Sequence, residues 1–346
     1  LIGILAYNVL FAYNGPDDNV LGGSNQFILL LGGAVAAIMG YFTKVPFHKM
    51  LEEVANNIKS TAGAILILLM VGALAGTWMV SGIIPSMIYY GLQILSPAVF
   101  LPATLIICSV ISIATGSSWT TSATVGIALI GIGGALGFDL GMVAGAVISG
   151  AYFGDKLSPM SDTTNLAPAM AGTDLFTHIK YMSLTTIPTY IITLLLFIIL
   201  GLSVDVTGEA NTDDLLNSIT ASFNVTPWLF LVPVIVIGLI VKKTEPLVAL
   251  LVGTLLAGIF AIIFQPEVVN GITGANSMTF KSAYKGVMEA ITSKVVVPTE
   301  NKTLTDLFTS GGMAKMLPTI WLILCAMVFG GIMDAIGALS RISESL

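Results

Sequence analysis

Long apolar runs constrain what this chain can fold into more than any other feature of its sequence. A helix needs ~20 apolar residues to cross about 30 Å of hydrocarbon. The clearest such runs are 25–42, 62–80, 184–201, 228–241, which is short, and 246–264. Residues 1–13 look like the remnant of another run, and 318–334 begins one more. Lipid offers the backbone no hydrogen-bond partner, and a helix satisfies its own groups. The sequence therefore predicts an all-α, polytopic membrane protein.

The charge content supports this class and excludes others. Charged residues make up 9% of the chain and hydrophobic residues 55%, whereas soluble domains carry about 25% charged residues. The net charge of −6 gives no reason to expect nucleic acid as a partner. Cys108 and Cys325 lie in apolar runs without metal-binding spacing, and His48 and His178 are the only imidazoles. We therefore expect no cofactor and no transition-metal site.

Both ends of the sequence lie at apolar runs. Leu1 is inside one such run, with no positively charged segment before it, so the sequence shows no signal peptide. Leu346 comes just after another apolar run. We expect the sequence to be part of a longer protein.

Lysine and acidic residues are distributed unevenly between the apolar runs. Cytoplasmic loops of membrane proteins are enriched in lysine and arginine. The acidic segments 14–24 and 202–226 contain neither, so we place them outside. Segment 265–317 also falls outside despite five lysines, since long loops follow the rule poorly. The lysine-bearing segments that we place in the cytoplasm are 43–60, 156–180 and 242–243. The pattern predicts a multi-pass protein of the inner (cytoplasmic) membrane.

The stretch 97–154 is apolar almost throughout but is interrupted by clusters of glycine and serine. The predicted orientation requires an odd net number of crossings between residues 81 and 183. Three full helices satisfy this requirement, and so does a re-entrant hairpin followed by one broken helix. The sequence does not choose between these arrangements.

Two segments of the chain match each other without a gap. "LLMVGALAGTWMVSGII" at 68–84 aligns with "ILCAMVFGGIMDAIGAL" at 323–339. The alignment pairs glycines at one offset of 255 residues: Gly76 with Gly331, and Gly82 with Gly337. The lysine distribution gives the two helices opposite directions across the membrane, which is typical of an inverted-topology repeat. A chance match between two glycine-rich apolar helices is the alternative.

Two stretches within the apolar part of the chain are polar: "ATGSSWTTSAT" at 114–124 and "GAYFGDKLSPMSDTTNL" at 150–166. Pro159 and Pro168 flank the core of the second stretch and interrupt a helix there. Interrupted backbone at membrane depth is tolerated only inside protein or beside a water-filled cavity. There its carbonyls, with nearby hydroxyls and carboxylates, suit a small hard cation. The predicted ion-binding residues are Asp162, Asp155, Thr163, Thr164, Asn165, Ser117, Ser118, Thr120 and Thr121.

Each polar stretch also has a structural explanation. Serine and threonine in membrane helices bond back to their own backbone or join neighbouring helices. Asp155 and Lys156 can form an ion pair at the cytoplasmic edge. Asp162 is harder to explain in this way, because a carboxylate at depth costs roughly 3 kcal/mol on insertion scales unless it is paired or hydrated. We therefore favour Asp162 as the ion-binding carboxylate, with Asp155 as the alternative.

The polar stretches resemble the signature region of the NhaC family of sodium/proton antiporters. The resemblance covers "TGSSWTTSATVGIALIGIG" and "AGAVISGAYFGDKLSPMSDTTNLAPAMAGTDLFTHI". It extends to "MVGALAGTWMVSGIIPSMIYYGL" upstream and "KKTEPLVALLVGTLLAGIFAIIFQ" downstream, and so to most of the chain. It implies the fold of the ion-transporter superfamily, with two inverted repeats, re-entrant hairpins and broken helices. In that fold "GSSWTT" is a hairpin tip and "SDTTN" is a helix break that faces it.

The resemblance also implies a domain organisation and an assembly. Residues 1–201 correspond to the first repeat, 202–226 to an extracellular loop, and 227–346 to the start of a second repeat that stops before its own polar motif. Half of the expected site then lies outside this sequence, and we expect the chain not to transport alone. The family fold contains a scaffold and a moving transport domain, and it is often a homodimer surrounded by membrane lipid.

The implied activity is secondary active exchange of Na+ for H+, with both ions as transported substrates rather than cofactors, and no enzymatic catalysis. Competition of the two ions for one carboxylate would couple their movements. The implied Na+ ligands are Asp162, Thr163, Asn165 and Ser118. Relatives in the same family exchange organic acids such as malate and lactate, or amino acids, and nothing in the motifs separates these substrates. An ion channel and a membrane-embedded enzyme are more distant alternatives.

Overall fold

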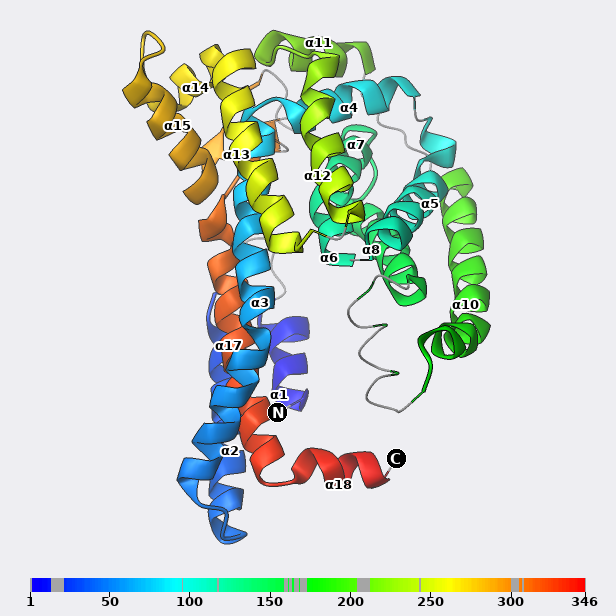
Figure 1. The fold of residues 1–346 in the computed structure, drawn as a ribbon, viewed down its shortest axis with the longest axis vertical. Helices are drawn as coiled ribbons and strands as arrows, with labels where there is room; N and C mark the ends of the chain where they lie inside the picture. Colours follow the sequence, from blue (N-terminus) through cyan, green and yellow to red (C-terminus); the bar gives the residue numbers. More distant parts are fainter. Residues whose placement is uncertain are drawn as a thin grey trace. The chain divides into compact units, whose positions relative to one another are not determined.

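The computed structural model describes residues 2–13, 22–94, 96–116, 118–158, 161, 164, 168, 173–203, 212–242, 244–299, 305–306 and 308–345. It is almost entirely helical (Figure 1). Within these residues five helices are long and apolar enough to cross a membrane, or six if one bent pair counts as a single span. The predicted fold class, an all-α polytopic membrane protein, is confirmed. The chain divides into two compact units, 1–69 with 313–346, and 70–312.

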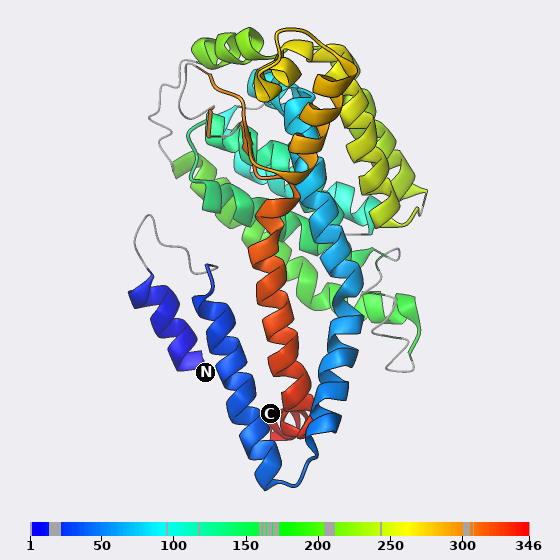
Figure 2. The ribbon, with the colours of Figure 1, turned by 90° about the vertical axis from the view of Figure 1, so that its left-hand side faces the viewer.

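The first unit combines helices from both ends of the sequence. Its elements are α1 (Ile2–Tyr7), η1 (Asn8–Ala12), α2 (Ser24–Phe42), the first part of α3 (Phe47–Val80), η4 (Met313–Met316), α17 (Leu317–Ala335) and α18 (Ala338–Ser345). Figure 2 shows α2, α17 and the first part of α3 side by side. A Cβ on Gly331 would lie 2.6 Å from Cα of Val54. The glycine therefore lets the backbones of α17 and α3 come into direct contact, as small residues do in many membrane helix pairs.

Within this unit α2 and α17 run in the same direction. Near the start of both helices, Nε2 of Gln26 donates to the carbonyl of Pro318 over 3.3 Å. Near the end of both, a Cβ on Gly40 would lie 2.8 Å from Cγ2 of Ile336. The lysine distribution also predicts this shared direction, from outside to cytoplasm.

The second unit holds the polar stretches. Its helices are the rest of α3, α4 (Ile83–Ile94), α5 (Pro97–Thr115), α6 (Ser118–Thr121), η2 (Ser122–Gly126), α7 (Ile127–Ala135), α8 (Leu140–Leu157), α10 (Leu175–Ser203), α11 (Thr212–Ser222), η3 (Pro227–Phe230), α12 (Leu231–Val241), α13 (Pro246–Phe264), α14 (Pro266–Thr273) and α15 (Phe280–Thr292). Two short strands, β1 (Val295–Val296) and β2 (Thr309–Ser310), pair antiparallel with Val295 opposite Ser310.

The stretch 97–154 consists of helical segments that alternate in direction. α5 has 19 residues and α8 has 18, which makes each about 27 Å long. Between them α6, η2 and α7 form the return segment. A Cβ on Gly126 would meet Val147, and one on Gly133 would meet Val143, so α7 runs antiparallel to α8. Three alternating segments are compatible with both arrangements that the sequence leaves open.

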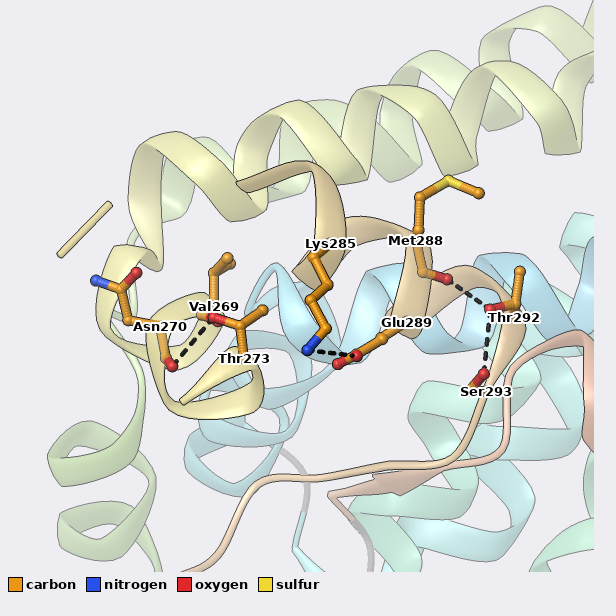
Figure 3. A network of polar contacts seen from close by, with 8 residues as sticks. All are labelled: Val269, Asn270, Thr273, Lys285, Met288, Glu289, Thr292 and Ser293. Atoms are coloured by element: carbon orange, nitrogen blue, oxygen red, sulfur yellow. Dashed lines mark hydrogen bonds and ion pairs between the residues drawn. The ribbon is translucent and has the colours of Figure 1, made fainter. Parts of the chain in front are cut away.

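Three segments predicted as loops contain helices instead. α3 begins at Phe47, so most of 43–60 belongs to a 34-residue helix. α11 occupies part of 202–226, and α14, α15 and the two strands lie within 265–317. A search for continuous apolar runs misses such helices because amphipathic helices carry polar residues along one face. Figure 3 shows this character at α15, where Lys285 pairs with Glu289 at 3.6 Å and Thr292 donates to the carbonyl of Met288 at 2.8 Å.

The run predicted at 228–241 does not continue straight from the segment before it. α11 and the following helix are bent by 84° at the break between them. The side chain of Gln265, only 2% exposed, holds this break: Oε1 accepts from the backbone N–H of Asn224 and Nε2 donates to its carbonyl, each over 2.9 Å. Gly82, with φ of +80°, lies against the same amide. Asn224 and Gln265 belong to segments predicted to lie outside, and Gly82 is near the end of the matched segment 68–84, which is predicted to run from cytoplasm to outside.

The two segments that match in sequence also end in the same way. α3 stops at Val80 before α4, and α17 stops at Ala335 before α18, at the same offset of 255 residues. The glycine between the helices is left-handed in both, with φ of +80° at Gly82 and +69° at Gly337. Three backbone hydrogen bonds, each from an N–H to a carbonyl, recur at this offset. In the first segment they join Ser81 to Thr77, Gly82 to Met79 and Ser86 to Gly82. In the second segment they join Ile336 to Ile332, Gly337 to Asp334 and Arg341 to Gly337. The inverted orientation of the repeat stays a prediction.

Candidate ion-binding site

A helix break lies within the first polar stretch. α5 ends at Thr115, and the next residue, Gly116, has a left-handed φ of +68° and an N–H that donates to the carbonyl of Ser112 over 2.8 Å. Glycine adopts this conformation without the steric cost of a Cβ. α6 then starts at Ser118. The polar residues of this stretch thus stand directly after a helix end, where backbone groups are available to a ligand.

Ser118 and Asp155 connect the two polar stretches. Oγ of Ser118, at the start of α6, donates to Oδ2 of Asp155, near the end of α8, over 2.9 Å. Ser118 is 4% exposed and Asp155 is half-buried. The sequence predicts both as ion-binding residues, although 37 positions separate them. The contact places a hydroxyl oxygen and a carboxylate together at a helix break, a combination that hard cations bind well.

Ser158 and Thr164, which follow α8 in the sequence, bond to backbone carbonyls of α5 and α8. Oγ1 of Thr164 donates to the carbonyl of Asp155 over 3.0 Å, and Oγ of Ser158 donates to the carbonyl of Ile113, on α5, over 2.8 Å. Both hydroxyl residues are buried, with Thr164 at 2% exposed. Thr164, another predicted site residue, therefore lies beside Asp155.

The backbones of α5 and α8 are in direct contact beside this site. A Cβ on Gly154 would lie 2.6 Å from the backbone nitrogen of Ile113, and one on Gly150 would lie 2.9 Å from Cβ of Cys108. Oγ of Ser112 also donates to the carbonyl of Ala151. Positions increase together along the two helices, so α5 and α8 run parallel. This packing fixes Asp155 relative to the end of α5.

Further buried hydroxyls surround the break. Besides Ser118, Asp155 and Thr164, the structure describes the side chain of one more predicted site residue, Thr121, which is fully buried. Thr124 and Ser161, which the sequence analysis does not select, are buried as well. Ser112 and Ser158 were also missed, although both bond across α5 and α8. The signal that could have found Ser112 is its position four residues before Gly116, on the α5 face that meets the glycines of α8.

Several predicted residues lie outside the described part of the chain. They are Ser117, Asp162, Thr163 and Asn165, together with the side chain of Thr120. Their roles stay predictions. Within the described residues the one ion pair is Lys285–Glu289. Asp155 bonds to Ser118 there and not to Lys156, so the alternative of a structural ion pair between these neighbours is not supported.

Comparison with known proteins places this chain in a family. Residues 150–346, more than half of the chain, match the Na+/H+ antiporter family. The chain belongs to the Na+/H+ antiporter family. The resemblance seen in the polar stretches is thereby confirmed.

Several antiporters are similar to this chain over most of its length. It is 37% identical over 322 residues to the malate-2H+/Na+-lactate antiporter of Bacillus subtilis, covering 92% of this chain and 65% of the relative. It is 35% identical over 312 residues to the Na+/H+ antiporter NhaC of Alkalihalophilus pseudofirmus, covering 90% and 64%. It is 32% identical over 331 residues to the arginine/ornithine antiporter ArcD of Halobacterium salinarum, covering 94% and 65%.

The chain thus spans just under two thirds of the length of these curated relatives. No solved structure matches it. The donors that this member of the antiporter family gathers at the break are hydroxyl, carbonyl and carboxylate oxygens. In the residues that the structure describes, no cluster of three or more His, Cys, Asp and Glu side chains forms. Oxygen donors of this kind suit an alkali cation, and a carboxylate among them also accepts a proton.

Proposed function

We propose that this protein is a secondary active antiporter that exchanges Na+ for H+ across the cytoplasmic membrane. The observation that carries the proposal is the contact between Ser118 and Asp155. It joins the two polar stretches at the break between α5 and α6, beneath buried hydroxyls. Membership of the Na+/H+ antiporter family supports it from the sequence.

The coupling in this proposal comes from competition at one carboxylate. Asp162 is our first choice for that group and Asp155 the alternative. Na+ needs several oxygens at once, which the carboxylate shares with Ser118, Thr163 and Asn165, whereas a proton needs only the carboxylate. Binding of one ion then excludes the other. Exchange follows if the loaded forms cross the membrane and the empty, charged form does not.

The proposal is tested with full-length protein in proteoliposomes that contain a pH-sensitive dye. We expect an Na+ pulse to collapse an imposed proton gradient in the wild type and Asp162→Asn to abolish the response. If Asp155 is the carboxylate instead, Asp155→Asn abolishes it and Asp162→Asn does not. Asp139→Asn is the matched control, because Asp139 caps the start of α8 by accepting from Met142 N–H, and asparagine caps equally well. Full activity in both test variants would refute the carboxylate mechanism.

A second candidate function is Na+-coupled exchange of an organic acid or an amino acid on the same scaffold. Its support is the similarity to the malate-2H+/Na+-lactate antiporter and to the arginine/ornithine antiporter. The same proteoliposomes decide between the two. Collapse of the proton gradient by Na+ without any organic substrate excludes this second function, whereas an absolute requirement for such a substrate excludes simple Na+/H+ exchange.

We further propose a homodimer in the cytoplasmic membrane as the working assembly, on the basis of the family resemblance. Native mass spectrometry of the protein released from lipid nanodiscs measures this directly. A mass of two chains is expected, and a single chain at all protein concentrations contradicts it.

A further inference from the structure

A polar cavity lies between α8 and α10, which Figure 1 shows as neighbours in the second unit. Its volume is about 280 Å³. The facing sides of both helices line it with Ser149, Tyr152, Lys156, Thr185, Thr189 and Thr193. Lys156 follows Asp155 directly on α8, and consecutive helical residues point about 100° apart. The cavity is therefore separate from the contact between Asp155 and Ser118.

The cavity opens on a helix whose outer surface suits lipid. Only 6% of the most apolar 18-residue stretch of α10 is buried. Leu184, Ile191 and Leu195 on this helix are exposed. Two aromatic residues stand at the same end of the helix pair, with Tyr152 51% and Tyr181 69% exposed. Tyrosine is enriched at the level of the lipid headgroups. The lysine distribution places this end at the cytoplasmic surface.

The threonines of α10 offer acceptors to this cavity. Thr185 donates to the carbonyl of Met182 over 3.0 Å, Thr189 to that of Thr185 over 2.8 Å, and Thr193 to that of Thr189 over 2.9 Å. A hydroxyl has one proton and two lone pairs. Since each proton is used within the helix, the oxygens are left to accept from a ligand that carries hydroxyl groups.

Lys156 adds the opposite chemistry. Its ammonium group has three donors and a positive charge, and among the described residues no carboxylate lies within 4.0 Å of it. The wall beside it is fixed, because the ring of Tyr190 stacks on Phe153 with centroids 3.8 Å apart and its hydroxyl lies 3.0 Å from Oγ of Ser109. A complementary ligand carries an anionic oxygen for the lysine and hydroxyl groups for the threonines.

We propose that this cavity binds a glycerol phosphate group, supplied by an anionic phospholipid of the phosphatidylglycerol type in the cytoplasmic leaflet. The phosphate contacts Lys156, the glycerol hydroxyls donate to the threonine oxygens, and the acyl chains lie along the exposed apolar face of α10. Basic pockets between helices on the cytoplasmic side bind lipid headgroups in this way. The proposal does not depend on which ion or substrate the antiporter exchanges.

The experiment uses delipidated full-length protein titrated with single lipids and analysed by native mass spectrometry. We expect phosphatidylglycerol to bind more tightly than phosphatidylcholine. Lys156→Gln should weaken phosphatidylglycerol binding about fivefold, the effect of one lysine at an anionic headgroup, and Lys156→Arg should preserve it. Lys180→Gln is the matched control, since Lys180 is exposed on α10 but does not line the cavity. Equal weakening by Lys156→Gln and Lys180→Gln, or none by Lys156→Gln, overturns the proposal.

Two further arms test the hydroxyl contacts and the source of the phosphate. Thr189→Val, which keeps the shape of the side chain, should weaken phosphatidylglycerol but not phosphatidylmethanol, whose headgroup has no hydroxyl. Loss of both lipids alike contradicts the assigned acceptor role. Free glycerol phosphate should displace the bound lipid only weakly. Displacement at concentrations equal to those of the lipid would assign the cavity to a soluble phosphate ester and overturn the lipid assignment.

Discussion

At Gly154 the absence of a side chain determines how closely α5 and α8 pack. The Cβ of any other residue would lie 2.6 Å from both the backbone nitrogen of Ile113 and the carbonyl oxygen of Ser109. Backbone atoms at such a distance cannot move aside as a flexible side chain would. The hydrogen bond between Ser118 and Asp155 lies at this end of the helix pair, so its geometry depends on the same close approach.

Gly154→Ala should therefore destabilise the protein by about 1–3 kcal/mol, the usual cost of overpacking, and reduce exchange activity by displacing Asp155. Gly145→Ala is the control on the same helix. Its Cβ would lie 3.8 Å from the ring of Phe197, an ordinary contact, so the variant should be neutral or slightly more stable. The measurement is the midpoint of thermal unfolding in lipid nanodiscs. Equal midpoints for the two variants would show that the α5–α8 contact is looser than described.

The residue types at the site could be predicted from the sequence, but their partners could not. Hydroxyl and carboxyl groups are conspicuous in an apolar chain, and Ser118, Asp155 and Thr164 were selected on that basis. The sequence left open an ion pair of Asp155 with its neighbour Lys156 as an alternative to an ion-binding role. The actual partner, Ser118, comes from another helix, and only the glycine packing of α5 on α8 brings it within reach.

At the scale of elements, the bend between α11 and η3 depends on one buried amide. Gln265 pairs with both the N–H and the carbonyl of Asn224, as a neighbouring strand would, and it comes from the junction of α13 and α14. The bend leaves these backbone groups without helical partners. Gln265 therefore fixes the direction in which the chain enters α12.

Gln265→Ala should lower the midpoint of thermal unfolding, since it removes two hydrogen bonds to the backbone of Asn224, each worth about 0.5–1.5 kcal/mol net. It should also raise hydrogen exchange at Asn224. Gln265→Glu should recover part of this stability, because its carboxylate can still accept from the N–H of Asn224. Glu267→Gln, at an exposed position on the next helix, serves as the control. Unchanged exchange at Asn224 in Gln265→Ala would rule out the proposed role of this side chain.

Long apolar helices such as α13 were predictable almost to the residue, because nothing but length and hydrophobicity defines them. Helices outside the apolar runs were not. α11 and α15 have a polar face and were taken as loops, and α3 extends far into a segment with three lysines. In each case the polar residues lie along a helix that a uniform hydrophobicity criterion cannot recognise.

At the scale of the whole molecule, the packing agrees with the orientation deduced from lysine. Asn224, Gln265 and Gly82 meet at one end of the second unit. Asn224 and Gln265 belong to segments assigned to the outside, and Gly82 is near the end of the matched segment 68–84, whose predicted direction is from cytoplasm to outside. In the first unit, the ends of α2 and α17 that carry Gly40 and Ile336 meet at a predicted cytoplasmic end. Segments that lie outside the bilayer can contact each other only when they are on the same side of it.

Single-cysteine labelling in intact cells checks this orientation. Cys108 and Cys325 are both buried and would first be replaced by alanine. With a membrane-impermeant maleimide, Ser277→Cys should be labelled and Lys44→Cys should be protected until the cells are permeabilised. Both positions are exposed, so access to the reagent depends only on the side of the membrane. The same labelling at both positions would contradict the assignment.

The close contact of α5 and α8 also restricts how such a transporter can move. Helices joined through their main chains at Gly150 and Gly154 cannot slide past each other without separating first. Any movement in the proposed exchange therefore has to displace α5 and α8 as one rigid unit. Asp155 moves with this pair, and Ser118, which follows α5 on α6, is tied to Asp155 by a hydrogen bond. In the proposed exchange, an ion bound between these two side chains therefore keeps both ligands during the movement.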